Sequence, residues 1–84
     1  MNTYLMLTTR TDQINQKHAA GHYEFLDRLH AEKRLKMFGP FSDATGGAYV
    51  IKAGSLEEAR EIGPADPLVF SGSSALTIKE WKLK

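Results

Sequence analysis

The chain contains no cysteine, so a disulfide framework, a thiolate zinc site and a cysteine nucleophile are all excluded. It also has almost no excess of one charge sign over the other, because 11 basic and 10 acidic side chains leave a formal net charge of only +1. Nucleic-acid binding is therefore not expected, since such surfaces concentrate Lys and Arg. No apolar run approaches the 18 or more residues of a membrane span, and the first residues lack the pattern of a secretion signal. We expect a soluble, unprocessed, cytoplasmic protein that binds neither nucleic acid nor membrane.

The length of 84 residues is that of a single domain, which we expect to span residues 1–84. A chain of this size buries only roughly 60% of the surface that its unfolded form exposes. Contact with a second subunit would add stability, and we therefore expect an oligomer.

Hydrophobic periodicity divides the chain into strands and helices in a definite order. The predicted elements are a strand at 4–9, a helix at 17–33, two strands around a turn between 35 and 50, a helix beginning at 56, a short helical turn at 65–70 and a strand at 75–83. This order is typical of an α+β, ferredoxin-like βαββαβ fold, in which a four-stranded antiparallel sheet carries both helices on one face. Apolar strand residues would remain on the other face, so we expect a second copy of the chain to cover it.

Several local signals set the predicted boundaries. Gly39-Pro40 requires the strand that contains it to be an edge, to bulge or to end there, because proline donates no ladder hydrogen bond. Ser55 and Glu58 match a capping box, in which Ser55 accepts from a helix amide and Glu58 reaches back to the amide of Ser55. Gly63-Pro64 predicts the end of that helix, with the glycine in a left-handed conformation.

His22 is the most interesting of the three histidines. Near the start of the predicted helix, a neutral imidazole is favoured by the positive end of the helix dipole and can act as a base. An equally good explanation is a structural histidine at the edge of the core. His18 and His22 have the spacing of a metal-binding pair, but no third ligand is placed to complete a site, and we expect no metal.

Asp66 precedes Pro67, which is an ordinary way to begin a helix, so a capping role explains it without any chemistry. Capping and a role in catalysis are compatible, because a carboxylate has two oxygens. Phe38, Phe41 and Tyr49 lie close to the predicted turn and are candidates to hold an aromatic ligand by stacking. Strand alternation would place one of the two phenylalanines in the core. The hydroxyl of Ser74, in the last loop, is a weaker candidate for ligand binding.

Together, these residues resemble the YCII-related (YciI-like) family over nearly the whole chain. The matching positions are His22 with Phe25, Leu26 and Leu29; Arg34-Leu35; Gly39-Pro40-Phe41; Asp43; Gly46-Gly47; Ser55 to Ala59; Asp66-Pro67; and Ser71-Gly72. The resemblance implies a dimeric α/β barrel and an active site built on a His-Asp pair, which map onto His22 and Asp66. The chain departs from the family pattern at Lys33, where a glycine is common, and at Leu68, where an aromatic residue is common.

The resemblance also implies a function, because some enzymes of this family are similar to dehydrochlorinases that convert a chlorinated hydroxyhydroquinone to a hydroxybenzoquinone. Our leading expectation is a lyase of that kind, with no cofactor and a small hydroxylated aromatic substrate. One alternative is a non-catalytic, dimeric binding or accessory protein in which His22 only lines a pocket. The other is an isomerase or monooxygenase of the same group of folds.

Overall fold

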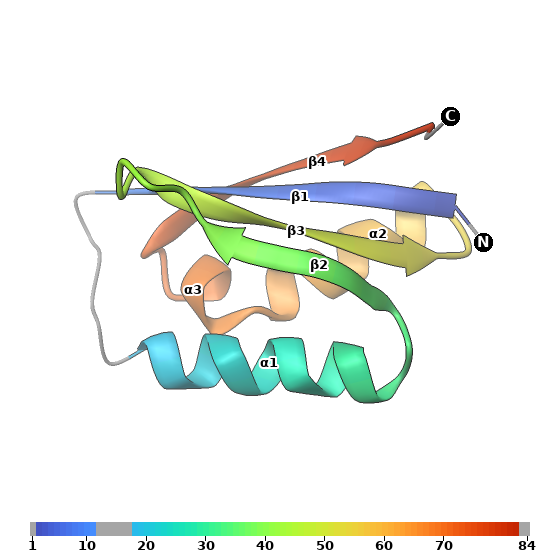
Figure 1. Ribbon diagram of the computed structural model, residues 1–84, viewed down its shortest axis with the longest axis horizontal. Coiled ribbons are helices and arrows are strands. Elements are labelled where there is room, and N and C mark those ends of the chain that lie inside the picture. The colour runs from blue at the N-terminus through green and yellow to red at the C-terminus, as the bar shows by residue number, and fades with distance from the viewer. Residues whose placement is uncertain (1, 12–17, 83–84) are drawn as a thin grey trace.

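Four strands form one antiparallel sheet, and the helices pack together on one of its faces (Figure 1). The computed structural model describes residues 2–11 and 18–82. Its elements are β1 (Asn2–Arg10), α1 (Ala19–Ala31), β2 (Leu35–Pro40), β3 (Gly46–Ala53), α2 (Leu56–Ile62), the 3-10 helix η2 (Gly63–Ala65), α3 (Pro67–Phe70) and β4 (Ser74–Glu80). The strand order β2-β3-β1-β4 is that of a ferredoxin-like fold, so the predicted fold class is confirmed. Lys17 and Leu83, at the predicted ends of the first helix and last strand, lie outside the described residues.

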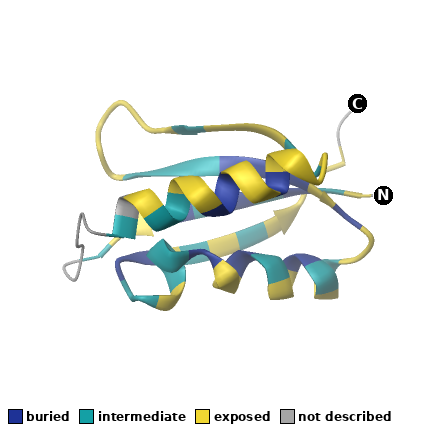
Figure 2. Ribbon diagram, turned by 90° about the horizontal axis from the view of Figure 1, so that it is seen from below, coloured by how far each residue is buried: buried dark blue, intermediate teal, exposed yellow. Residues whose placement is uncertain are grey.

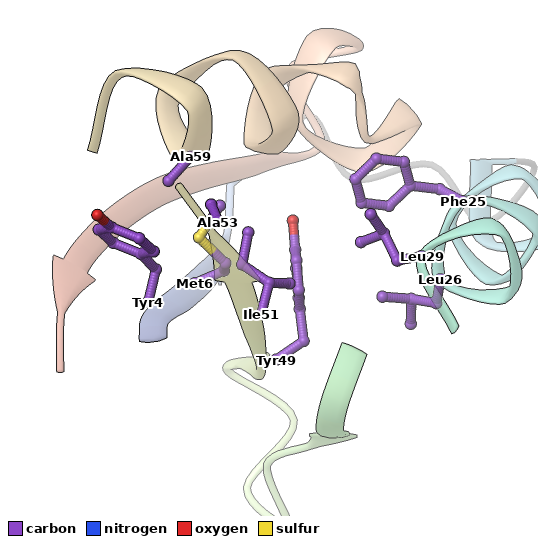
Figure 3. Close-up of a cluster of buried hydrophobic side chains, with 9 residues drawn as sticks. All are labelled: Tyr4, Met6, Phe25, Leu26, Leu29, Tyr49, Ile51, Ala53 and Ala59. Carbon is purple, nitrogen blue, oxygen red and sulfur yellow. The ribbon is translucent and has the colours of Figure 1, made fainter. Parts of the chain in front are cut away.

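The hydrophobic core lies between the sheet and the helices. Along β1, Tyr4 and Met6 are fully buried while the residues between and beside them are more exposed, as expected from a strand with one face on the core. Helix α1 turns its buried positions toward the sheet and its exposed ones toward solvent (Figure 2). The core side chains in Figure 3 are Tyr4, Met6, Phe25, Leu26, Leu29, Tyr49, Ile51, Ala53 and Ala59. None of the helices in the described ranges is long and apolar enough to span a membrane.

The helices do not cover the opposite face of the sheet (Figure 1). Leu5 of β1 and Met37 of β2 both lie opposite Val50 of β3 in the strand register, one on each side of it. Val50 is buried between its neighbours, whereas Met37 is 63% exposed. An apolar stripe therefore runs across this face.

Strand β2 meets two of the three conditions that allow a proline in a strand: it is an edge strand, and it ends at Pro40. Its pairing with β3 also shifts register, but between Leu35 and Met37, away from the proline. In the following turn Asp43 accepts hydrogen bonds from the amide and the hydroxyl of Thr45 at 3.1 and 2.7 Å. The left-handed residue of the turn is Ala44 rather than a glycine. Gly46 is needed for a different reason, because a Cβ there would lie 1.9 Å from the carbonyl oxygen of Thr8.

The beginning of α2 confirms half of the predicted capping box. The side chain of Ser55 accepts a hydrogen bond from the amide of Glu58 at 3.2 Å. The carboxylate of Glu58 accepts from the amide of Gly54 at 3.1 Å instead of from Ser55, so the reciprocal bond was predicted one residue too late.

The end of α2 corrects the expectation for Gly63. This residue has right-handed helical angles (φ −56°, ψ −50°), and the chain continues directly into η2. The requirement for glycine comes from packing, because a Cβ would lie 2.5 Å from a methyl group of Leu76 and 2.9 Å from that of Met6. The left-handed helix end occurs instead after α1, at Lys33 (φ 61°).

Candidate active site

His22 and Asp66 form a direct hydrogen bond although 44 positions separate them in the chain. His22 lies in the first turn of α1, and Asp66 is the N-cap of α3. The Nδ1 atom of His22 is 2.8 Å from Oδ2 of Asp66. The second carboxylate oxygen of Asp66 accepts from the amide of Leu68 at 2.9 Å. The carboxylate therefore caps α3 and holds the imidazole at the same time, as its two oxygens allow.

The close approach of α1 and α3 depends on Gly21. A Cβ at this position would lie 3.0 Å from Cγ and 3.3 Å from Cβ of Pro67, closer than ordinary carbon contacts. Gly21 precedes His22, and Pro67 follows Asp66, so this contact is next to the hydrogen-bonded pair. Gly21 thus has a packing role between the two helices.

The environment of the pair determines the tautomer of His22. A carboxylate only accepts hydrogen bonds, so Nδ1 carries a proton and donates a hydrogen bond to Asp66. In the neutral imidazole the lone pair is then on Nε2, the nitrogen that does not contact Asp66. The side chain of Asp66 is fully buried, whereas 16% of the His22 side chain is exposed. Only the imidazole of the pair is accessible to a ligand.

A cavity of about 150 Å³ lies beside His22. It is bounded by the start of α1, by α3 and by the end of the sheet next to the turn between β2 and β3. A cavity of this volume is large enough to hold a benzene ring. Its lining is formed by Thr8, Arg10, His22, Tyr23, Leu26, Phe38, Gly39, Pro40, Gly46, Gly47, Ala48, Tyr49 and Leu68. Aromatic rings also flank the imidazole, with centroid separations of 5.5 Å for Tyr23 and 6.2 Å for Tyr49.

Tyr49 extends from β3 toward the helices (Figure 3). Its hydroxyl is buried and has no hydrogen-bond partner among the described residues. Burial raises the pKa of this phenol, and the negative charge of Asp66 raises the pKa further. Tyr49 is therefore protonated at neutral pH and keeps an unused donor close to the His22–Asp66 pair.

The structure brings together some of the candidate site residues and not others. His22 and Asp66 are hydrogen bonded, and Phe38 and Tyr49 line the cavity. Phe41 and Ser74 are not among the lining residues: Phe41 lies one residue beyond β2, and Ser74 is buried opposite Arg10 in the β1–β4 pairing.

Neither Phe38 nor Phe41 belongs to the core, because they are 54% and 41% exposed, which corrects the expectation that one of them would be buried. Phe38 is on an edge strand, and Phe41 lies just beyond that strand.

The lining also contains residues that were not predicted to belong to the site, among them Arg10 and Leu68. Arg10 shares a strand face with Thr8, and a predicted first strand one residue longer would have included it. Leu68 was noted only as a departure from the family pattern. Within residues 2–11 and 18–82, no group of three His, Asp or Glu side chains is close enough together to hold a metal ion.

Comparisons with known proteins agree with this fold and identify a family. The family model described as the YCII-related domain matches residues 1–82. The uncharacterized protein YjpA of Bacillus subtilis (strain 168) is 83% identical over 84 residues, which cover 100% of this chain and 99% of that protein. A similar fold is found in a 5-chloro-2-hydroxyhydroquinone dehydrochlorinase from Burkholderia phenoliruptrix AC1100, solved in complex with 2,5-dihydroxybenzoquinone. The two structures have a TM-score of 0.82 at 22% identity, and the likeness covers 98% of this chain and 95% of that one.

Proposed function

The chain belongs to the YCII-related family, and from this premise we propose that it is a cofactor-independent dehydrochlorinase. Its substrate would be a small chlorinated and hydroxylated aromatic compound, such as a chlorohydroxyhydroquinone. In this proposal His22 is the general base, and Asp66 fixes its tautomer and stabilises the imidazolium that forms.

The observation that carries the proposal is the 2.8 Å hydrogen bond between Nδ1 of His22 and Oδ2 of Asp66 beside a cavity the size of one aromatic ring. A buried carboxylate that orients an accessible imidazole is a recurring arrangement for proton transfer. The dehydrochlorinase from Burkholderia phenoliruptrix supports this choice of reaction through its similar fold.

The reaction needs only proton transfers and the departure of chloride. Nε2 of His22 accepts a proton from one ring hydroxyl, and the ring carbon that carries chlorine takes up a proton as that oxygen becomes a carbonyl. Ionisation of a second hydroxyl then forms a second carbonyl. The carbon–chlorine bond breaks at the same time, and its electron pair leaves with chloride. The ring has lost one proton and one chloride ion overall, so the sum of these steps requires no external oxidant or reductant.

We assign contact with the ring to Phe38 and Tyr49, because both line the cavity. Stacked or edge-on aromatic contacts contribute about 0.5–1.5 kcal/mol each beyond the buried area. Phe41 and Ser74 are outside the lining and are not part of this assignment.

We further propose that two copies of the chain pack through the uncovered face of the sheet. The apolar stripe formed by Leu5, Val50 and Met37 supports this arrangement, because a second sheet would remove it from water. Sedimentation should give about twice the chain mass of 9.4 kDa, and Leu5→Glu should give a monomer. A wild-type monomer at micromolar concentration would rule out the dimer.

The proposed activity is tested by incubating the protein with chlorohydroxyquinol while chloride release and quinone absorbance are recorded. His22→Ala should lose about 10²–10⁴-fold in turnover, the usual contribution of a general base. His30→Ala is the matched control, because His30 lies on the same helix but is exposed and outside the cavity lining. If both variants retain wild-type rates, His22 is not the base. If the wild type binds the ring and releases no chloride, the chain is a binding protein.

A further inference from the structure

Arg10 places a positive charge at the cavity, and the proposed reaction gives this residue no role. It is the last residue of β1, and it lines the cavity together with Thr8, two positions earlier on the same strand. Its backbone is held in place, because its amide donates to the carbonyl of Thr45 at 2.9 Å.

The guanidinium of Arg10 has no ion-pair partner among residues 2–11 and 18–82. Arg34 provides a contrast within the same chain, because its guanidinium contacts the carboxylates of both Glu32 and Glu58. An arginine at a cavity with its donors unused can bind an incoming acceptor without first breaking an internal ion pair.

Among the described residues, the rest of the lining contains no group that would neutralise Arg10. No Asp or Glu is among these lining residues, and the carboxylate of Asp66 is fully buried and bonded to His22 and Leu68. The hydroxyl of Thr8 already donates to the carbonyl of Gly47 at 3.1 Å. Within the part of the chain that the structure describes, Arg10 is thus the one permanently charged side chain that lines this cavity.

We propose that Arg10 binds an anionic oxygen of the ring, so that the site prefers an ionised hydroxylated aromatic, such as the ring after His22 has removed a hydroxyl proton, over a neutral one. The inference rests on the proposed function, which supplies the aromatic ring as the ligand. The preference for a charged ligand follows from Arg10 itself. A hydroxyquinone anion spreads its charge over two oxygens like a carboxylate, and the planar guanidinium fork is suited to such a group. Arg10 is a specificity-determining residue, and His22 remains the base.

The test measures binding of two compounds with the same carbon and oxygen skeleton. 2,5-Dihydroxybenzoquinone is an anion at neutral pH, and its reduced form, 1,2,4,5-tetrahydroxybenzene, is uncharged. Calorimetric titration under nitrogen should show that the wild type prefers the anion. Arg10→Gln should lose roughly tenfold to a hundredfold in affinity for the anion and change little for the neutral ring. Arg10→Lys should restore part of the preference, and the wild-type preference should decrease as salt is added.

Arg60→Gln is the matched control, because Arg60 is an exposed arginine on α2 outside the cavity. It makes the same change in net charge and should leave both affinities unchanged. The inference is overturned if the wild type shows no preference for the anion. It is also overturned if Arg10→Gln weakens the binding of both ligands equally, or of neither. Failure of the proposed function looks different. A protein that prefers the anion through Arg10 but releases no chloride retains this inference and loses the dehydrochlorinase assignment.

Discussion

The contact between Gly21 and Pro67 makes a specific prediction for Gly21→Ala. The new Cβ would lie 3.0 Å from Cγ of Pro67, whereas carbon atoms prefer about 3.5–4.0 Å. Helices α1 and α3 must therefore separate by roughly 0.5–1 Å at this point. The bond between His22 and Asp66, now 2.8 Å, would lengthen beyond about 3.2 Å, where hydrogen bonds of this kind weaken.

The stability and the activity of this variant should respond differently. Alanine favours the helix by up to about 1 kcal/mol over glycine. Overpacking costs about 1–3 kcal/mol, so the free energy of unfolding should stay the same or fall by up to about 2 kcal/mol. Turnover should fall by about tenfold or more, because small displacements of catalytic groups have large effects on rate.

Urea denaturation, chloride release and the proton NMR signal of the His22 Nδ1–H group together test this prediction. Ala20→Gly is the control, because Ala20 is exposed on the same turn and reports the helix propensity alone. If Gly21→Ala is more stable than the wild type by about 1 kcal/mol, with an unchanged Nδ1–H signal and full activity, the packing argument is wrong.

Three further predictions concern stability. Tyr49→Phe should leave the free energy of unfolding unchanged or raise it by up to about 1 kcal/mol, because the lost hydroxyl has no partner among the described residues; a large decrease in urea denaturation would contradict this. Glu58 accepts hydrogen bonds from the side chain of Arg34 and from the amide of Gly54, and these bonds lower the pKa of Glu58 in the folded state. Its stabilising effect is therefore present above the ordinary glutamate pKa and is lost as the pH falls through the lowered value, so the difference in urea midpoint between wild type and Glu58→Gln should be larger at pH 7 than at pH 3. Lys33→Gly should raise the free energy of unfolding by about 0.5–1 kcal/mol, because Lys33 has left-handed angles, and a lower melting temperature would refute that explanation.

Local sequence signals predicted the elements well where neighbouring residues decide the structure. Asp66-Pro67 begins α3 with the expected side-chain cap, and Ser55 begins α2 in the same way. The order of elements then determined the ferredoxin-like sheet. Such signals succeed because a capping bond joins residues two or three positions apart.

Distant contacts were the part that sequence reasoning could not supply. Gly63 was predicted to be left-handed, but its requirement for glycine comes from Leu76 and Met6, which are far away in the chain. The distance between His22 and Asp66 likewise depends on how α1 packs against α3. Arg10 was missed because its side chain matters only in relation to a cavity formed by other elements.

The central claim is that His22 and Asp66 act as one unit, and a double-mutant cycle on kcat/KM for chloride release tests it most directly. The four proteins are the wild type, His22→Ala, Asp66→Asn and the double variant, each first checked for folding because Asp66 also caps α3. If Asp66 acts only through His22, the double variant should lose no more than His22→Ala alone, about 10²–10⁴-fold. Losses that multiply in the double variant would show that the two residues act independently and would contradict the proposed mechanism.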